Sequence, residues 1–221
     1  MTRPQVVSRA AWRAALSDFR EDEKAATRAR DALNARRRRL PITAVERDYV
    51  FGSPAGPLHF ADLFDNKQQL IVYHNMLAPG SDHICRGCSL FADQIGNLAH
   101  LGARRTSFAM VSRATVPEIA RVKTRLGWSF PWYSSHGGSF HEDFVGSLGQ
   151  ASFGLSVFLR ENERIFQTYF TSGRGVEYVG GAFSLLDLTL WGRQEAWEDS
   201  PEGWPQEPTH SWERLHDEYG S

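Results

Sequence analysis

A continuous apolar run that leads into a pair of cysteines constrains the fold of this chain most. The run QQLIVYHNML spans residues 68–77 and suits a strand that is buried on both faces of a sheet. Cys85 and Cys88 follow it, and they are the only cysteines of the chain. A strand buried on both faces needs covering layers above and below it, so the sequence favours a layered α/β fold.

The segments around this run alternate between helical and extended patterns. The stretch RDYVFGSPAGPLHFADLF at 47–64 predicts a hairpin around a Gly/Pro turn, followed by a short helical step. The elements expected after the cysteines are a helix with apolar residues recurring from Leu90 to Leu101, a second buried strand at 106–113, a helix at 116–126, an antiparallel hairpin at 154–170 and a closing helix at 176–188. The strand, helix, strand, helix order at the centre predicts parallel pairing of the two buried strands.

A long charged segment precedes this pattern. Residues 7–39 predict one helix, ended by Pro41, with a narrow apolar stripe at seven-residue steps that runs from Trp12 to Leu33. Glu23 and Arg30 interrupt the stripe, which disfavours a long coiled coil. We expect this helix to pack on the body of the protein or on a second subunit, which would make a homodimer.

The chain therefore divides into three predicted parts: an N-terminal helical extension (1–41), an α/β domain (42–192) and an acidic C-terminal tail that packs on the domain (193–221). The net charge is −1, but it is unevenly spread, with a basic N-terminal and an acidic C-terminal end. The run RRRR at 36–39 lies in the last turn of the predicted helix, where the helix dipole favours cations. Basic and aromatic residues do not interleave as in a single-strand-binding groove, so we expect no nucleic-acid partner.

The cellular compartment expected for this protein limits which roles the two cysteines can have. No apolar run approaches the roughly 20 residues of a membrane span, and the residues after Met1 lack a basic segment followed by an apolar core. We expect a soluble, cytoplasmic protein with no membrane partner. Cytosolic thiols are kept reduced, and a disulfide between Cys85 and Cys88 would close too small a loop to stabilise much, so a structural disulfide is the weakest interpretation.

A redox pair is the stronger interpretation of the two cysteines. Cys85 is expected where a strand gives way to a helix, so unpaired N–H groups and the helix dipole favour its thiolate. Cys88, one turn on, is close enough to resolve a mixed disulfide, and Arg86 between them adds a cation. At this point the order of elements from Leu70 to about Leu188 resembles the thioredoxin superfamily, and the preceding hairpin resembles that of peroxiredoxin-like members.

Five stretches sharpen the resemblance: YHNMLAPGSDHICRGCSLFAD, FAMVSRA, LGWSFPWYSS, LLDLTLWGRQE and PEGWPQEP with a later HDEY. They resemble the motifs of the DUF899 family, and the resemblance covers nearly the whole chain. It implies an α/β, thioredoxin-like sheet with helices on both faces, a long N-terminal helix and an irregular C-terminal tail. It also implies a dithiol-disulfide oxidoreductase without a cofactor, with Cys85 and Cys88 as catalytic residues and a disulfide-bearing protein or small thiol as substrate.

Metal binding is an alternative of a different class. Ile84 stands where thioredoxins have a tryptophan, and the stretch SFGLS at 152–156 lacks their proline, so metal exclusion at this face is in doubt. Two thiolates with imidazoles would suit zinc or cuprous ion. The candidate imidazoles are those of His74, His83, His136 and His141. None stands at a diagnostic spacing from the cysteines, so each is first of all a surface or loop residue.

A peroxiredoxin-like peroxide reductase is a weaker alternative. Peroxiredoxins place a proline and a Thr or Ser seven and three residues before the attacking cysteine. These positions hold Ala78 and Asp82 before Cys85, and Ser81 and Cys85 before Cys88, so neither cysteine fits. A non-catalytic interaction protein with a redox-sensing disulfide also stays open.

Two further segments allow more than one role. The aromatic stretch from Trp128 to Trp132, with Phe130 and Pro131, either walls a groove near the cysteines or packs in the core. The stretch SSHGGSFHEDF at 134–144 forms either a lid or ligand loop or, as its two glycines among polar residues indicate first of all, a flexible connection.

Overall fold

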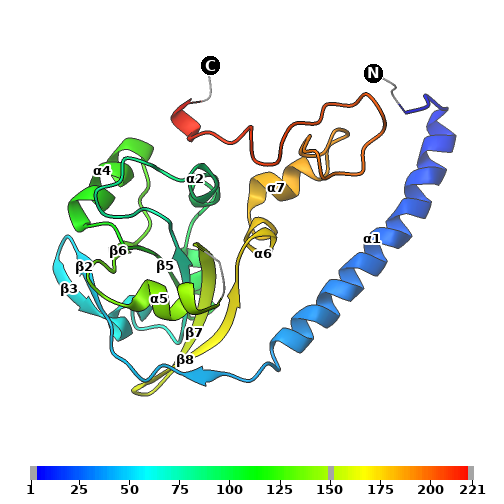
Figure 1. The fold of residues 1–221 in the computed structure, drawn as a ribbon. Helices are drawn as coiled ribbons and strands as arrows, with labels where there is room; N and C mark the ends of the chain where they lie inside the picture. The colour runs from blue at the N-terminus through cyan, green and yellow to red at the C-terminus, as the bar shows by residue number, and fades with distance from the viewer. Residues whose placement is uncertain (1–3, 149–151, 219–221) are drawn as a thin grey trace. The chain divides into compact units, whose positions relative to one another are not determined.

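The computed structural model describes residues 4–148 and 152–218, which contain an eight-stranded sheet and several helices (Figure 1). The strands are β1 (Thr43–Ala44), β2 (Val50–Ser53), β3 (Gly56–His59), β4 (Gln69–His74), β5 (Thr106–Ser112), β6 (Trp132–Ser134), β7 (Gly154–Glu161) and β8 (Arg164–Thr171). The α-helices are α1 (Arg9–Arg37), α2 (Arg86–Ala92), α3 (Ala99–Gly102), α4 (Val116–Leu126), α5 (Phe140–Phe144), α6 (Arg174–Glu177) and α7 (Gly181–Leu186). Three 3-10 helices are η1 (Phe60–Phe64), η2 (Gly146–Leu148) and η3 (His216–Glu218).

The strand order of the sheet is β1-β8-β7-β4-β5-β6-β2-β3. Strands β4 and β5 pair in parallel, as their connection through α2 and α3 requires, and β5 and β6 also pair in parallel. The hairpin β7–β8 joins the other side of β4 with antiparallel pairing. The centre of the sheet therefore has the thioredoxin-like order β8-β7-β4-β5, and the predicted α/β fold is confirmed.

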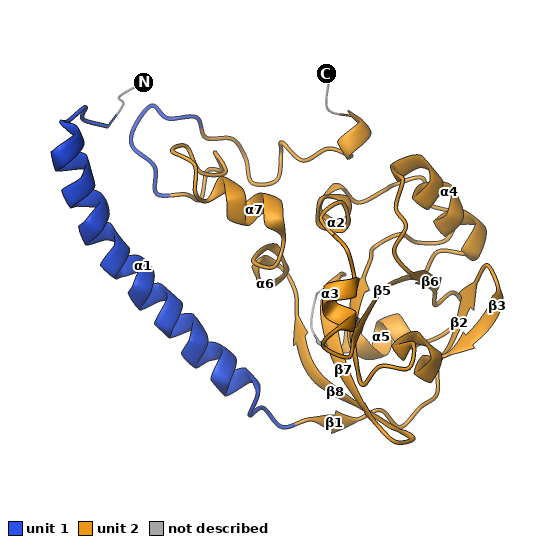
Figure 2. Cartoon of the chain, turned by 180° about the vertical axis from the view of Figure 1, so that it is seen from behind, with its two compact units in different colours: residues 1–41, 199–205 blue, residues 42–198, 206–221 orange. Residues whose placement is uncertain are grey.

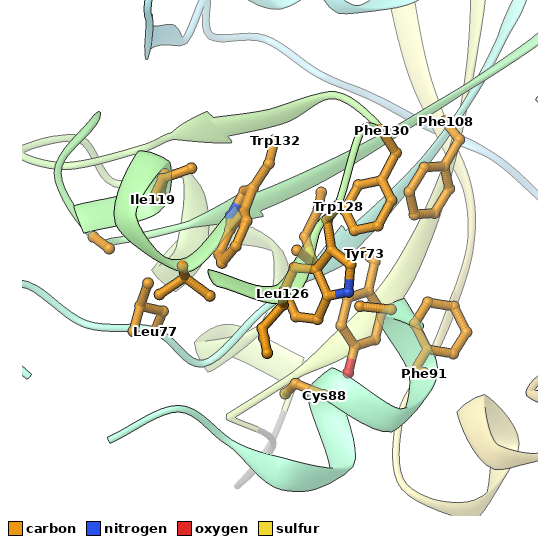
Figure 3. Close-up of a cluster of buried hydrophobic side chains, with 14 of the residues drawn as sticks. Tyr73, Leu77, Cys88, Phe91, Phe108, Ile119, Leu126, Trp128, Phe130 and Trp132 are labelled. Carbon is orange, nitrogen blue, oxygen red and sulfur yellow. The ribbon is translucent and has the colours of Figure 1, made fainter. Parts of the chain in front are cut away.

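Alternate residues of the central strands enter two separate cores. Tyr73 and Met110 contribute to a cluster with residues of α2 and α4 on one face of the sheet (Figure 3). Val72 and Val111, their neighbours along the same strands, contribute to a second cluster with residues of η1 and α5. The expectation of helices on both faces of the sheet is thus confirmed, because successive side chains of a strand point to opposite faces.

Helix α4 has the bounds that the sequence predicts, and its ends explain why. Glu118 accepts hydrogen bonds from both the backbone N–H and the hydroxyl of Thr115, each at 2.7 Å, and so forms a capping box at the N-terminus. Gly127 ends the helix with a φ of 65°, a left-handed conformation that favours glycine.

Two helices that the sequence predicts to be continuous are each divided into two shorter helices. The helix that begins after Cys85 ends at Ala92, and α3 starts anew at Ala99, where the side chain of Asn97 accepts a hydrogen bond from the Ala99 N–H. The predicted closing helix at 176–188 is divided into α6 and α7, because Gly180 takes an extended conformation and caps α7.

The segment at 134–144, predicted to be a flexible connection, contains α5, and Phe140 packs in the second core.

Two compact units divide the chain (Figure 2). One unit holds residues 1–41 and 199–205, and the other holds residues 42–198 and 206–221. In the first unit α1 begins at an N-cap, Ser8, whose hydroxyl accepts a hydrogen bond from the Ala11 N–H at 3.2 Å. The helix ends with Arg36 and Arg37 in its last turn, and none of its residues is buried. No helix within residues 4–148 and 152–218 is both long enough and apolar enough to cross a membrane.

Candidate active site

Cys85 and Cys88 lie at the start of α2, directly after the loop that follows β4. Cys85 is the N-cap of this helix, and its sulfur accepts a hydrogen bond from the backbone N–H of Cys88 at 3.3 Å. The backbone oxygen of Cys85 accepts hydrogen bonds from both the N–H and the hydroxyl of Ser89. Both cysteines are free thiols; Cys85 is partly exposed, whereas Cys88 is only 2% exposed. The two sulfurs therefore have different surroundings although they share one helical turn.

Hydrogen bonding stabilises the thiolate of Cys85. The thiol of Cys88 is the largest cause that lowers the pKa of Cys85, to about 7. Partial burial opposes this shift, and backbone N–H groups of Cys88 and Gly87 add to it. Like burial, the negative charge of Glu213 raises the pKa of Cys85. The hydrogen bonds therefore stabilise the thiolate in spite of a nearby carboxylate. At neutral pH a large part of Cys85 is ionised.

The surroundings of Cys88 have the opposite effect. Its hydrogen bond to Cys85 and its burial raise the pKa of Cys88 well above the ordinary value, and a hydrogen bond with Tyr73 offsets part of the shift. The phenol of Tyr73 points toward the helix that carries Cys88 (Figure 3). Burial raises the pKa of Tyr73 well above its ordinary value as well, so its hydroxyl stays protonated. A protonated Cys88 thus supports an ionised Cys85.

A pocket of about 420 Å³ opens over the cysteine pair. Its apolar lining comes from four separate segments, and its charged lining comes from α6 and the C-terminal segment. The lining side chains include, besides the two cysteines, those of Tyr73, Phe91, Phe153, Arg174, Val176, Glu177, Phe183, His210 and Glu213. Its size falls within the roughly 300–1,000 Å³ of small-molecule sites.

Glu213 is a charged group that lies close to the cysteine motif. A Cβ atom on Gly87 would lie 3.1 Å from the Oε2 atom of Glu213, so a glycine between the cysteines gives the carboxylate room. Glu213 is 6% exposed, and its Oε1 atom lies 2.7 Å from Nδ1 of His210. Burial raises the pKa of Glu213, and the interaction with His210 opposes that shift.

The imidazoles predicted as metal ligands do not gather at the cysteines. His74 is fully buried on the face of β4 opposite to Tyr73, where its ring stacks on Phe140 and its Nε2 atom lies 2.8 Å from the Ser156 hydroxyl. His141 lies beside it, with ring centroids 6.4 Å apart. Burial lowers the pKa of His74 to about 3, so this imidazole is neutral.

The two remaining candidate imidazoles are exposed. His83 lies in the loop before Cys85. His136, Tyr49 and Phe51 line a different pocket, near the edge of the sheet that β2 and β3 form. Within residues 4–148 and 152–218, no three His, Cys, Asp or Glu side chains form a group that could hold a metal ion.

The structure also shows where the aromatic stretch from Trp128 to Trp132 and the side chain of Arg86 lie. Trp128, Phe130 and Trp132 pack in the same core cluster as Cys88, so of the two roles predicted for this stretch they take the core role (Figure 3). The indole of Trp128 also donates a hydrogen bond to Asp93 at 2.7 Å. Arg86 is exposed and lines a small pocket beside the motif rather than the one over the cysteines.

Sequence reasoning missed the residues that line the pocket from α6, α7 and the C-terminal segment. His210 and Glu213 lie more than 120 positions after Cys85, and no local spacing connects them to it. Their only sequence signal is the acidic character of the tail, which predicts packing on the domain but not a place at the cysteines.

Comparison with known proteins gives a family and distant structural similarities. No curated protein matches the chain. A solved structure of a hypothetical protein from Sinorhizobium meliloti 1021 is similar with a TM-score of 0.41 and 13% identity, over 60% of this chain and 71% of that chain. The apo Sco1 protein of Thermus thermophilus is similar with a TM-score of 0.37 and 18% identity, over 66% of this chain and 94% of that chain.

The family match is much more extensive than these structural similarities. The sequence profile of the family described as "Bacterial protein of unknown function (DUF899)" matches residues 1–219. This match covers the cysteine motif, the whole sheet and the C-terminal segment that lines the pocket. The chain therefore belongs to the DUF899 family.

Proposed function

We propose that this protein is a thioredoxin-like thiol-disulfide oxidoreductase in which Cys85 attacks and Cys88 resolves. The observation that carries this proposal is the different placement of two thiols within one helical turn: Cys85 caps α2 with its sulfur and borders the pocket, whereas Cys88 is buried. The pKa of Cys85 is lowered to about 7 and its sulfur borders the pocket, whereas the pKa of Cys88 is raised and its thiol is buried. A nucleophilic thiol with a pKa near the ambient pH combines a useful thiolate fraction with high intrinsic nucleophilicity.

The proposed reaction has two steps. The Cys85 thiolate attacks one sulfur of a substrate disulfide, the substrate S–S bond breaks, and one substrate half leaves as a thiolate that takes up a proton. Cys88 then loses its proton and attacks the sulfur of Cys85 in the mixed disulfide, which releases the second substrate thiol. The substrate gains two electrons and two protons, and the cysteine pair becomes an internal disulfide.

The burial of Cys88 fits its assigned step. While Cys88 keeps its proton, it donates the hydrogen bond that stabilises the Cys85 thiolate. Once Cys85 is in a mixed disulfide, that negative charge is gone, and the main influence that raises the pKa of Cys88 is removed. Cys88 is then easier to ionise, and it attacks a sulfur on the same helical turn. A further thiol reductant must return the pair to two thiols.

Trapping of mixed disulfides tests the proposal. Cys88→Ser leaves the attacking thiol but removes the resolving one, so in a cell extract it should accumulate covalent adducts that disappear on adding dithiothreitol. Cys85→Ser is the matched control, with the same atom replaced one turn away, and should accumulate almost none. Equal trapping by both variants, or none by Cys88→Ser together with one equivalent of bound zinc or copper in the reduced wild type, would overturn the assignment.

A further inference from the structure

Access to the cysteine pair is limited by segments that are distant in sequence. The lining of the pocket over Cys85 includes residues of α6 and α7, together with His210 and Glu213 of the C-terminal segment. The Glu213 carboxylate packs against the backbone of Gly87, between the two cysteines. Cys85 is partly exposed and borders this half-open pocket of about 420 Å³, so a substrate sulfur that reaches Cys85 through it passes between these segments. This volume suits a small molecule and is far below that of a folded protein.

The pocket offers apolar contact next to the sulfur of Cys85. Phe91 is buried on α2, Val176 is buried on α6, and Phe183 is buried on α7. Phe153, just before β7, completes this lining. Methylene groups that flank a disulfide bond would be buried against these side chains.

Carboxylates dominate the charges around the pocket. His210 lies among three of them: its Nδ1 atom is 2.7 Å from Glu213, its Nε2 atom is 3.8 Å from Glu177, and its backbone N–H donates to Glu195 at 3.0 Å. The negative charges of Glu195 and Glu177 contribute to raising the pKa of Glu213, although burial is the larger cause.

Two guanidiniums balance only part of this charge. Arg193 lies 2.6 Å from Glu177 and also donates two hydrogen bonds to Asp187, at 2.7 and 2.9 Å. Arg174 lies 3.9 Å from Glu177 and over the ring of Trp197. The network has the carboxylates of Glu177, Asp187, Glu195 and Glu213 against these two cations, so it is negative even when His210 is protonated.

We propose that this pocket selects a small disulfide with protonated amino groups and short methylene arms, and disfavours both anionic disulfides and folded proteins. The inference rests on the proposed function, since the bound disulfide is the oxidant of the reaction. Its S–S bond breaks, its two halves leave as aminothiols with two electrons and two protons from the reduced pair, and Cys85 and Cys88 form the internal disulfide. The ammonium groups interact favourably with Glu213 and Glu177, and the methylene arms contact Phe91 and Phe183.

Three small disulfides of similar length test the charge selection. The reduced wild-type protein is mixed with cystamine, hydroxyethyl disulfide or dithiodiglycolate, which are dicationic, neutral and dianionic, and the loss of free thiol is followed over time. Each rate is divided by the rate of the same disulfide with dithiothreitol, which removes differences in intrinsic reactivity. The corrected rates should fall in that order, with cystamine about tenfold or more above dithiodiglycolate at low salt, and insulin should react more slowly than cystamine.

Glu213→Gln should lower the ratio of the corrected rate with cystamine to the corrected rate with dithiodiglycolate. The substitution removes a negative charge at the pocket and keeps the shape of the side chain. Glu163→Gln is the matched control: it makes the same change on the exposed turn between β7 and β8 and should leave the ratio unchanged. The wild-type series decides the question even if Glu213→Gln does not fold. Equal corrected rates, or faster reaction with insulin, would overturn this inference and leave the proposed function standing, whereas no exchange with any disulfide would overturn both.

Discussion

The backbone N–H of Cys88 donates a hydrogen bond to the sulfur of Cys85 at 3.3 Å, and the thiol of Cys88 is the largest cause that lowers the pKa of Cys85. Alkylation of Cys85 should therefore show a midpoint near pH 7. Cys88→Ser keeps an O–H donor and should retain most of this shift. Cys88→Ala has no side-chain donor, so the midpoint should rise toward the ordinary thiol value of about 8.5. Iodoacetamide reaction rates measured against pH check this, and identical midpoints in both variants would contradict it.

Glu213 acts on the same thiol through its charge. Because its carboxylate raises the pKa of Cys85, Glu213→Gln should shift the alkylation midpoint to lower pH. The shift should shrink at high salt only slightly, since Glu213 is 6% exposed and buried charges are weakly screened. The same pH series with Glu163→Gln is the control. A midpoint that stays in place, or rises, would show that Glu213 does not face the thiolate.

His74 should make the folded state sensitive to acid. Its pKa is lowered to about 3 by burial, so between about pH 6.5 and 3 the unfolded state binds a proton that the folded state does not. Its contribution to stability is fully present above pH 6.5 and is lost as the pH falls, at up to about 1.4 kcal/mol per pH unit. Buried His141, whose pKa is also lowered, adds in the same direction.

His74→Gln tests this contribution, because the amide still reaches the Ser156 hydroxyl but cannot take up a proton at these pH values. Urea unfolding at a series of pH values should give a flatter loss of stability below pH 6.5 for the variant than for the wild type. Parallel curves would mean that His74 is already charged or accessible in the folded protein.

Gly154 should tolerate no side chain. A Cβ atom there would lie 2.5 Å from the ring of Phe170 and 2.9 Å from the backbone oxygen of Thr171. Gly154→Ala should destabilise the protein by about 1–3 kcal/mol, because the hairpin β7–β8 must shift to relieve the overlap. A Cβ atom on Gly102 would lie 3.5 Å from the flexible side chain of Lys67, which is an ordinary contact, so Gly102→Ala should be neutral or stabilising. Equal unfolding midpoints for the two variants would contradict this account.

The central fold could be predicted because its signals are local. The continuous apolar run around Val72 and Tyr73, and the capping box of Thr115 and Glu118 that starts α4, act through neighbours within a few residues. Strand β6 was missed because its three residues lie within an aromatic stretch that also suits a core loop. A strand this short gives almost no periodicity, so only its pairing with β5 defines it.

The site could be predicted only in part for a related reason. Cys85 and Cys88 were found because their spacing is itself a signal. The position of Glu213 against Gly87 depends on the path of the C-terminal segment through space, and the two residues are far apart in the chain. The same holds for His74 and Ser156, whose pairing requires the antiparallel contact of β4 with β7.

Reversible oxidation of the cysteine pair tests the central claim most directly. The wild-type protein is equilibrated in glutathione buffers of graded potential, quenched with acid and alkylated with a mass-tagged reagent. We predict one two-electron transition, from two tagged thiols to none, with a midpoint between about −270 mV, as for thioredoxin, and about −120 mV, as for DsbA. Neither Cys85→Ser nor Cys88→Ser can form the internal disulfide, so any thiol lost in these variants should appear as a glutathione adduct. A wild-type pair that keeps both thiols throughout this range would contradict the account, because no dithiol mechanism could then operate between Cys85 and Cys88.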